Sequence, residues 1–332
     1  MTSLPPSPIS TTIDYDADGV QHGHLVLPYS RDDAAYGSIM IPIAVIKNGD
    51  GPTALLSGGN HGDEYQGPLS LLKLANTLDP ADVTGRVIIV PTMNQPAFAA
   101  ARRTSPIDDG NLNRMFPGRP NGTHTERIAD YFTRTLLPMA DAVVDIHDGG
   151  STLEFIPMAS SLALDDADTE ATGAVAAEAF RAPFVTKLVE LDMLGMWDLV
   201  VAEAGLPFVT TELGGTGSTR PWIVAIVDRG VRNILRHWGV LTGELEGTPS
   251  QRIVIPDTDA YVISDTDGLI EWLVELGDPI TAGQPIACVH EPRRLGVEPT
   301  VYCATIDGLL AMRHHPGLVK MGDAIAMQAH LA

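Results

Sequence analysis

Short apolar runs, typical of buried strands, alternate with segments of helical leucine spacing from about residue 50 to residue 245. Strands that alternate with helices pack as layers, so this pattern predicts an α/β domain. We expect strands at 24–27, 38–46, 53–57, 87–91, 142–146 and 208–212, and helices at 69–78, 126–135 and 222–238. Thr123 or Thr125 is expected to cap the second of these helices.

The pattern changes near residue 248, where short strands punctuated by Gly and Asp begin. Two stretches there, starting at Gly268 and Gly308, resemble each other and the two halves of a lipoyl or biotinyl carrier barrel. A carrier needs an exposed Lys in the turn between its halves, and residues 290–299 contain none. We therefore expect a carrier-like all-β domain without carrier chemistry. The expected division of the chain is 1–247, with residues 1–12 as a loose arm, and 248–332.

Acidic side chains outnumber basic ones twofold: 42 Asp and Glu against 21 Lys and Arg give a formal net charge of −21. A surface of this sign repels nucleic-acid phosphates and anionic lipid headgroups, so neither is an expected partner. Hydrophobic residues make up 44% of the chain and charged residues only 19%. This composition predicts a folded core rather than disorder.

The N-terminal residues have neither the basic segment nor the apolar segment of a secretory signal. The apolar runs are shorter than the roughly 18 residues of a membrane span. Cys288 and Cys303 are the two cysteines of the chain, and this spacing suits neither a zinc knuckle nor a disulfide framework. These features predict a soluble protein of the reducing cytoplasm.

His61 and Glu64 follow a predicted strand and precede a predicted helix. At this spacing an imidazole and a carboxylate can face one ion, and both groups are ligands of zinc. His147 ends another predicted strand and offers a third ligand, which Asp145, on the same strand face, could orient. Taken singly, each residue also has an ordinary interpretation. His61 could be a hydrogen-bonding loop residue, Glu64 a helix-dipole residue and His147 a capped strand-end histidine.

Two further segments carry groups suited to catalysis. The loop at 102–118 concentrates guanidinium and amide donors, which suit carboxylate binding and oxyanion stabilisation: Arg102, Arg103, Asn113 and Arg114. Glu212 ends a predicted apolar strand and has no basic partner nearby in the sequence. It is therefore a candidate general base.

Together these segments resemble the succinylglutamate desuccinylase and aspartoacylase family, a branch of the zinc carboxypeptidase-like fold. Five separated motifs occur in the family's order within roughly residues 50–215: 59–64 (Gly-Asn-His-Gly-Asp-Glu), 94–97 (Asn-Gln-Pro-Ala), 111–114 (Asn-Leu-Asn-Arg), 145–147 (Asp-Ile-His) and 211–212 (Thr-Glu). The resemblance implies a three-layer αβα arrangement around a mixed, mostly parallel sheet. It also implies that the C-terminal β domain partly covers the active site.

The same resemblance implies roles for the residues within these motifs. His61, Glu64 and His147 would bind one zinc ion per chain. Glu212 would act as the general base and later as the proton donor. The implied reaction is hydrolysis of the amide of an N-acyl amino acid.

The substrate-facing residues also follow from the resemblance. Arg103, or its neighbour Arg102, would polarise the scissile carbonyl, and Asn113 and Arg114 would bind a substrate carboxylate. If the substrate also carries an ammonium group, several acidic residues could receive it: Asp108, Asp109, Asp148 and Glu154.

Within the family, the chain most resembles the branch that removes acetate from an N-acetyl-2,4-diaminobutanoate during ectoine breakdown. The expected partner is thus a small molecule, and the sequence leaves open whether the chain forms a homo-oligomer. One alternative is deacylation of N-succinylglutamate or N-acetylaspartate. Another is a zinc carboxypeptidase, which needs an open cleft. A third is a small-molecule binding protein on the same fold, which would have lost a metal ligand or the base.

Overall fold

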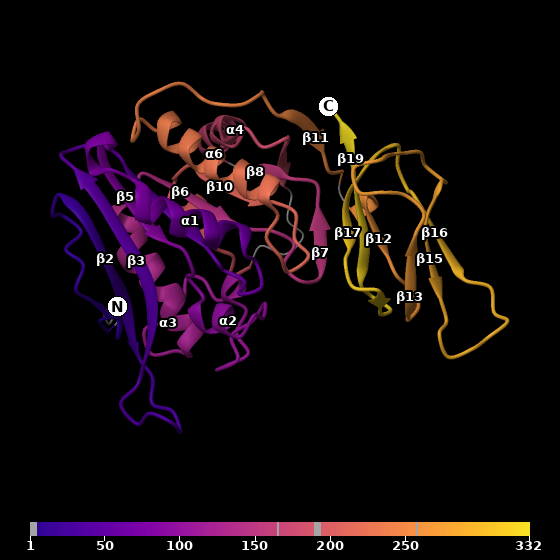
Figure 1. The fold of residues 1–332 in the computed structure, drawn as a ribbon, viewed down its shortest axis with the longest axis horizontal. Helices are drawn as coiled ribbons and strands as arrows, with labels where there is room; N and C mark the ends of the chain where they lie inside the picture. Colours follow the sequence, from indigo (N-terminus) through magenta and orange to yellow (C-terminus); the bar gives the residue numbers. More distant parts are fainter. Residues whose placement is uncertain (1–4, 165, 189–193, 257) are drawn as a thin grey trace.

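A long mixed sheet runs from the N-terminal half of the chain into the C-terminal strands, and helices cover its first part (Figure 1). The computed structural model describes residues 5–164, 166–188, 194–256 and 258–332. The strands of the first part are β1 (Ser10–Thr11), β2 (Gly19–Pro28), β3 (Ser38–Asn48), β4 (Thr53–Gly58), β5 (Gly85–Val90), β6 (Ala142–Ile146), β7 (Leu153–Phe155), β8 (Met158–Leu162), β9 (Phe184–Leu188) and β10 (Phe208–Glu212). The α-helices are α1 (Gln66–Thr77), α2 (Gln95–Ala99), α3 (His124–Tyr131), α4 (Ala167–Phe180), α5 (Trp197–Glu203) and α6 (Pro221–His237).

Strand directions in this first part are mixed, in the order β1-β2-β3-β5-β4-β6-β10-β8-β9. β5, β4, β6 and β10 run parallel, and so do β8 and β9. β1, β2, β3 and β5 pair antiparallel, and β8 runs antiparallel to β10. The expectation that most strand pairs of this sheet are parallel is wrong. The connection at 29–37 is short, so β2 and β3 form a hairpin, and this hairpin adds antiparallel strands beside the parallel strands at the centre of the sheet.

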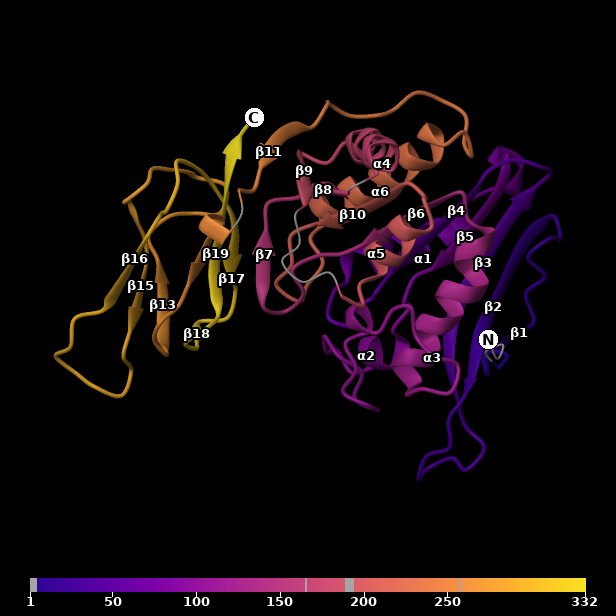
Figure 2. The same ribbon diagram turned by 180° about the vertical axis from the view of Figure 1, so that it is seen from behind.

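Helices lie on both faces of the sheet, as three layers require (Figure 2). α1, α4 and α6 share one apolar core with Leu56 and Val144, whereas α3 and α5 share another with Leu55 and Val143. Neighbouring residues of a strand point to opposite faces, so the continuous apolar runs of β4 and β6 fill both cores. In the described part of the chain, no helix combines the length and the apolar character needed to cross a membrane.

The predicted helices are found close to their expected positions. α3 is capped by Thr123, whose Oγ1 accepts from the N–H of Glu126 at 3.3 Å while Glu126 Oε2 accepts from the N–H of Thr123 at 2.7 Å. This reciprocal pair is a capping box. Thr125, the other candidate cap, instead donates its hydroxyl to Asp108. After α3 the chain continues as a π-helical turn over Phe132–Leu136.

The N-terminal arm joins the sheet instead of lying loose. Residues 1–4 lie outside the described residues, but β1 pairs with β2, Ile9 is buried, and so is Ile13 directly after the arm. The expected loose arm therefore differs from the structure at these positions, because two isoleucines supply enough apolar surface to bind the arm to the core.

The C-terminal strands are β11 (Gln251–Val254), β12 (Tyr261–Ile263), β13 (Gly268–Trp272), β14 (Pro279–Ile280), β15 (Pro285–His290), β16 (Thr300–Cys303), β17 (Gly308–His314), β18 (Leu318–Val319) and β19 (Ala324–Leu331). β16, β15, β13 and β18 form a separate four-stranded antiparallel sheet. The two sequence repeats exchange strands: β14 pairs with β17, and β18 pairs with β13. The middle strand of each repeat thus pairs with the first strand of the other.

Two strand pairings join the C-terminal strands to the first part of the chain. β11 runs parallel to β9 and antiparallel to β19. β7 runs antiparallel to β17, beside which it lies in Figure 1. Strands from both sides of residue 248 therefore belong to one hydrogen-bonded sheet.

Candidate active site

The carboxyl ends of β4, β6 and β10 lie at one edge of the sheet. The loop after β4 carries His61 and Glu64, His147 follows β6 directly, and Glu212 is the last residue of β10. Because these strands are parallel neighbours, segments far apart in the sequence meet at this edge. Thr211 connects two of them, since its Oγ1 accepts from the N–H of His147 at 3.1 Å.

Two glycines allow the loop after β4 to approach its neighbours closely. A Cβ on Gly62 would lie 2.0 Å from the carbonyl carbon of Ala97. A Cβ on Gly67, in the first turn of α1, would lie 2.7 Å from Cβ of Ile146. The missing side chain of Gly62 therefore lets the loop pack against α2, and that of Gly67 lets α1, with Glu64 just before it, pack against the end of β6.

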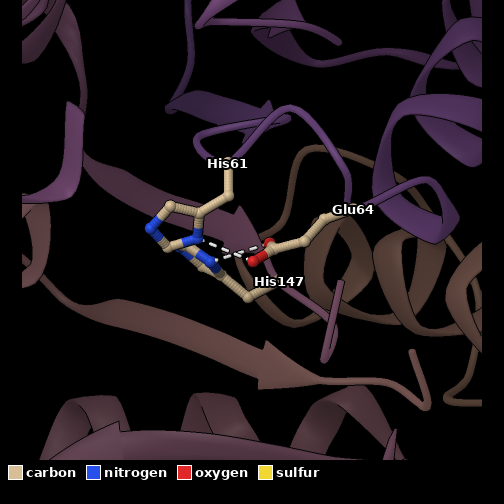
Figure 3. A group of neighbouring side chains, drawn as sticks. All are labelled: His61, Glu64 and His147. Carbon is tan, nitrogen blue, oxygen red and sulfur yellow. Dashed lines mark hydrogen bonds and ion pairs between the residues drawn. The ribbon is translucent and has the colours of Figure 1, made fainter. Parts of the chain in front are cut away.

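His61, Glu64 and His147 form a buried group whose ligand atoms all lie within 4.8 Å of one another (Figure 3). Glu64 lies against both imidazoles: its Oε1 is 2.6 Å from Nδ1 of His61, and its Oε2 is 3.0 Å from Nδ1 of His147. The structure thus brings together the three residues that the sequence singles out as metal ligands, and this group could hold a metal ion.

The outer nitrogen of each imidazole lies beside an oxygen that can accept a hydrogen bond. Nε2 of His147 lies 2.9 Å from the Asp145 carboxylate, which only accepts hydrogen bonds. Nε2 of His61 lies 3.2 Å from Oδ1 of Asn111, an oxygen that also accepts the N–H of Asn113 at 3.1 Å. Nδ1 of each ring lies within hydrogen-bond distance of the Glu64 carboxylate, which also only accepts, so Nδ1 donates to Glu64 in this structure. Loss of these two protons would leave two Nδ1 lone pairs and a carboxylate facing one another, which suits a cation bound between them.

Asp145 has the surroundings of a carboxylate that orients a metal ligand. Besides His147, it accepts from Nδ2 of Asn60 at 2.9 Å and from the hydroxyl of Ser57 at 2.8 Å. Burial raises the pKa of Asp145, but the charge of His147 and these hydrogen bonds outweigh burial and keep the pKa below its ordinary value. The ionised Asp145 fixes the ring of His147.

Buried carboxyl groups accumulate beside the His61–Glu64–His147 group. Glu212 Oε2 is buried and has no hydrogen-bond partner among the described residues. Burial and the charge of Glu64 raise the pKa of Glu212 well above its ordinary value. Burial and Glu64 also raise the pKa of Asp148 to about 7. A divalent cation would offset this negative charge and favour the ionised carboxylates. The charge distribution therefore fits a metal ion, and so do the ligand atoms of His61, Glu64 and His147.

A pocket of about 150 Å³ opens beside this group. Drug-sized ligands occupy pockets of roughly 300–1,000 Å³, so this one suits a small molecule. Its lining residues are His61, Arg103, Asn113, Arg114, His147, Asp148, Gly149, Leu153, Phe155, Leu188, Met196, Asp198, Thr210 and Glu212.

Of the two arginines left open by the sequence, the structure places Arg103 in the pocket. Its Nη1 lies 3.7 Å from Oε1 of Glu64, and about half of its side chain is exposed. Arg102 is not among the lining residues, and its guanidinium lies 3.6 Å from Asp109. Arg114 lines the pocket from an exposed position and donates to the carbonyl of Asn113 at 2.7 Å.

The candidate ammonium receptors have other partners. Asp148 lines the pocket, but its Oδ2 accepts the N–H groups of Tyr65 and Gln66 at the start of α1, at 3.0 and 3.1 Å. Asp108 accepts from Thr125, and Asp109 pairs with Arg102. Glu154 lies between two arginines and is not among the pocket residues.

Comparison with known proteins identifies the relatives of this fold and site. The model of the succinylglutamate desuccinylase/aspartoacylase catalytic domain matches residues 50–238. The chain belongs to this family. It is 53% identical over 328 residues to the N-alpha-acetyl-L-2,4-diaminobutyric acid deacetylase of Halomonas elongata, covering 98% of this chain and 96% of that one.

Solved structures of the family superpose closely on this one. The product-bound ectoine utilization protein EutE (DoeB) of Ruegeria pomeroyi is 53% identical, with a TM-score of 0.97, covering 98% of this chain and 99% of that one. A succinylglutamate desuccinylase from Silicibacter sp. TM1040 is 52% identical, with a TM-score of 0.97, covering 99% and 100%. The resemblance drawn from the sequence motifs is therefore confirmed.

Two residues beside the candidate site were given no role from the sequence. Asp198 lies in the first turn of α5, is buried and lines the pocket. It follows Trp197, whose N–H donates to Oδ1 of Asn113 at 2.9 Å. Asn111 belongs to the Asn-Leu-Asn-Arg motif, but its contact with His61 was not expected. A buried acid within an apolar stretch is the sequence signal that could have found Asp198.

Proposed function

We propose that the protein is a zinc-dependent hydrolase that removes the acetyl group from N-α-acetyl-L-2,4-diaminobutyrate in ectoine degradation. The observation that carries the reaction class is the convergence of His61, Glu64 and His147 near the buried carboxyl of Glu212. The similarity to the Halomonas elongata deacetylase over nearly the whole chain supports the substrate. The small pocket favours an acyl amino acid over a peptide, and so disfavours a carboxypeptidase.

Zinc is the metal we propose for the His61–Glu64–His147 group, one ion per chain. Two imidazole nitrogens and one carboxylate are a ligand set of catalytic zinc sites, which keep one position open. Bound there, zinc would supply the Lewis acidity that activates a water molecule and polarises a carbonyl.

The side chains around this group would carry the remaining steps. Glu212 would take the proton of the attacking water and return it to the leaving amine, a task that suits a carboxyl of raised pKa. Arg103 would donate to the oxyanion that develops on the carbonyl oxygen of the acyl group as the water adds to its carbon. Arg114, with Asn113 beside it, would bind the carboxylate of the substrate.

Competing substrates test the proposed function. The purified, zinc-loaded protein is expected to release acetate from N-α-acetyl-L-2,4-diaminobutyrate with a higher kcat/KM than it shows for N-acetylaspartate or N-succinylglutamate. The amino-acid side chain of either competing substrate carries a carboxylate, whereas that of the proposed substrate carries an ammonium group. Faster turnover of N-acetylaspartate or N-succinylglutamate would contradict the proposed substrate, and hydrolysis of none of the three compounds would contradict the proposed activity.

The pocket acid Asp198 is expected to favour the ammonium group of this substrate. Asp198→Asn keeps the size of the side chain but removes its charge. We expect kcat/KM for the proposed substrate to fall about tenfold to a hundredfold, the range for one hydrogen bond to a charged group. N-acetyl-2-aminobutyrate, which lacks the ammonium group, serves as the matched substrate and should be little affected. An equal fall for both substrates would exclude this role.

Asp145→Asn tests whether Asp145 orients His147 as a metal ligand. Because the amide is neutral, we expect the affinity for zinc to fall by about 10- to 100-fold, as for other residues that orient metal ligands. A titration against a chromophoric chelator measures this affinity. Asp141→Asn is the matched control and should leave the zinc affinity unchanged. Asp141 directly precedes β6, at the end of the strand far from His147, and accepts a hydrogen bond from the N–H of Thr53. Unchanged zinc affinity in Asp145→Asn would refute the role.

We also propose that residues 248–332 form a carrier-like fold that lacks carrier chemistry and adjoins the active site. The exchange of strands between the repeats supports this fold, and the turn between them has no Lys. The cytoplasm is the compartment that we propose, with support from the two free thiols, Cys288 and Cys303.

A further inference from the structure

Glu154 is a buried carboxylate that lies outside the pocket and forms ion pairs with two arginines from distant parts of the chain. Its Oε1 lies 2.7 Å from Nη1 of Arg220, the residue that precedes α6. Its Oε2 lies 2.8 Å from Nη2 and 2.9 Å from Nε of Arg313, on β17. The side chain of Glu154 is only 4% exposed. We refer to these three residues as the Glu154 cluster.

The strand that carries Glu154 forms one side of the pocket. Leu153 and Phe155 of β7 are lining residues, and Glu154 between them is not. Successive side chains of a strand point to opposite faces, so Glu154 points away from the substrate space. Any effect of Glu154 on the reaction must therefore pass through the position of β7.

Backbone hydrogen bonds connect β7 with the loops that follow both catalytic strands. The N–H of Leu153 donates to Gly149, two residues after His147, at 2.9 Å. The N–H of Phe155 donates to Gly214, two residues after Glu212, also at 2.9 Å. The loop from Leu213 to Arg220 is thus held at one end by β7 and at the other by the Glu154 cluster.

The opposite edge of β7 pairs with β17. The paired residues are Phe155 with Met312, Glu154 with Arg313 and Leu153 with His314. β7 is only three residues long, so few backbone bonds fix its position. A buried carboxylate with two charged partners adds stronger, directional contacts to that short pairing.

We propose that the Glu154 cluster is a positioning device: Arg313 of β17 and Arg220 hold β7 so that Leu153 and Phe155 form the pocket wall, and the C-terminal strands thereby set how tightly the substrate binds. This inference rests on the proposed function and adds a specificity role for the C-terminal strands. Among the described residues, no hydrogen bond or ion pair joins the cluster to Glu212 or to the His61–Glu64–His147 group, so the cluster contributes to substrate binding more than to the chemical step.

Arg313→Met tests this proposal, because it keeps the length of the side chain and removes its charge. We expect KM for N-α-acetyl-L-2,4-diaminobutyrate to rise about tenfold with kcat changed less than about threefold, since lost uniform binding raises KM alone. Arg313→Lys keeps one charged donor and should restore part of the affinity. The N–H of Thr216 donates to the carbonyl of Leu153 at 3.1 Å, so hydrogen exchange at the N–H groups of Phe155 and Thr216 should accelerate in Arg313→Met.

Arg252→Met is the matched control, because Arg252 of β11 forms an exposed ion pair with Glu178 of α4, away from β7. Its KM and kcat should equal those of the wild type. Unchanged kinetics in Arg313→Met, or a fall in kcat at constant KM, would overturn the proposal. So would the same KM increase in Arg252→Met. If Arg313→Met does not fold, Arg313→Lys alone tests the proposal: a raised KM would support it, and an unchanged KM would contradict it. An inactive zinc-loaded wild type would instead refute the proposed function.

Discussion

Replacing Glu212 by Gln is expected to reduce kcat by about a thousandfold, within the range attributed to a positioned general base. The amide has nearly the size and shape of the carboxyl group but cannot accept the proton of an attacking water. Glu212 lies at the end of β10, and its Oε2 has no hydrogen-bond partner in the described part of the chain, so the substitution removes no contact that holds the fold. Steady-state assays of acetate release measure the effect.

The interpretation of Glu212→Gln depends on an intact metal site. We expect the variant to keep the same zinc content as the wild type, measured by elemental analysis, because His61, Glu64 and His147 are unchanged. Glu203→Gln, an exposed substitution on α5, is the matched control and should retain full activity. A Glu212→Gln variant with wild-type turnover would exclude Glu212 as the base.

The central strands and two long helices could be predicted because their sequences carry a clear period. The apolar runs of β4 and β6 are buried on both faces, and α6 has its apolar residues at helical spacing. The segment from β8 to α5 could not be predicted in this way. β8 buries Ser160 and Ser161, and α4 is rich in Ala, so neither shows a contrast between apolar and polar faces.

The convergence of His61, Glu64 and His147 could be predicted because these residues follow parallel strands that end at the same edge of the sheet. Arg103 and Arg102 could not be separated, since the two adjacent side chains point differently only once the loop is folded. Glu154 was considered as a receptor for an ammonium group because its charge is visible in the sequence. Its two arginine partners come from residues 220 and 313, and such distant pairing leaves no local signal.

Removal of the metal is expected to abolish turnover and to destabilise the fold. If the free metal is present at about a thousand times its Kd, its loss lowers the free energy of unfolding by about 4 kcal/mol. The physical reason is that Glu64, Glu212 and Asp148 then remain buried close together without the cation that offsets their charge. Calorimetry before and after dialysis against a chelator measures the change in Tm, and acetate release measures the turnover.

Restoration by different metals separates the metal site from a general effect of dialysis. Zinc is expected to restore both Tm and turnover, whereas Mg²⁺, which prefers six oxygen ligands, should restore neither. His147→Ala should behave like the metal-free protein, because it removes one of three ligands and leaves Glu64 without its second imidazole. His290→Ala is the matched control: His290 forms an exposed pair with Glu271 on the separate C-terminal sheet, so its loss should change neither the zinc content nor the rate. Turnover that persists after the metal has been removed would show that His61, Glu64 and His147 do not form a catalytic metal site.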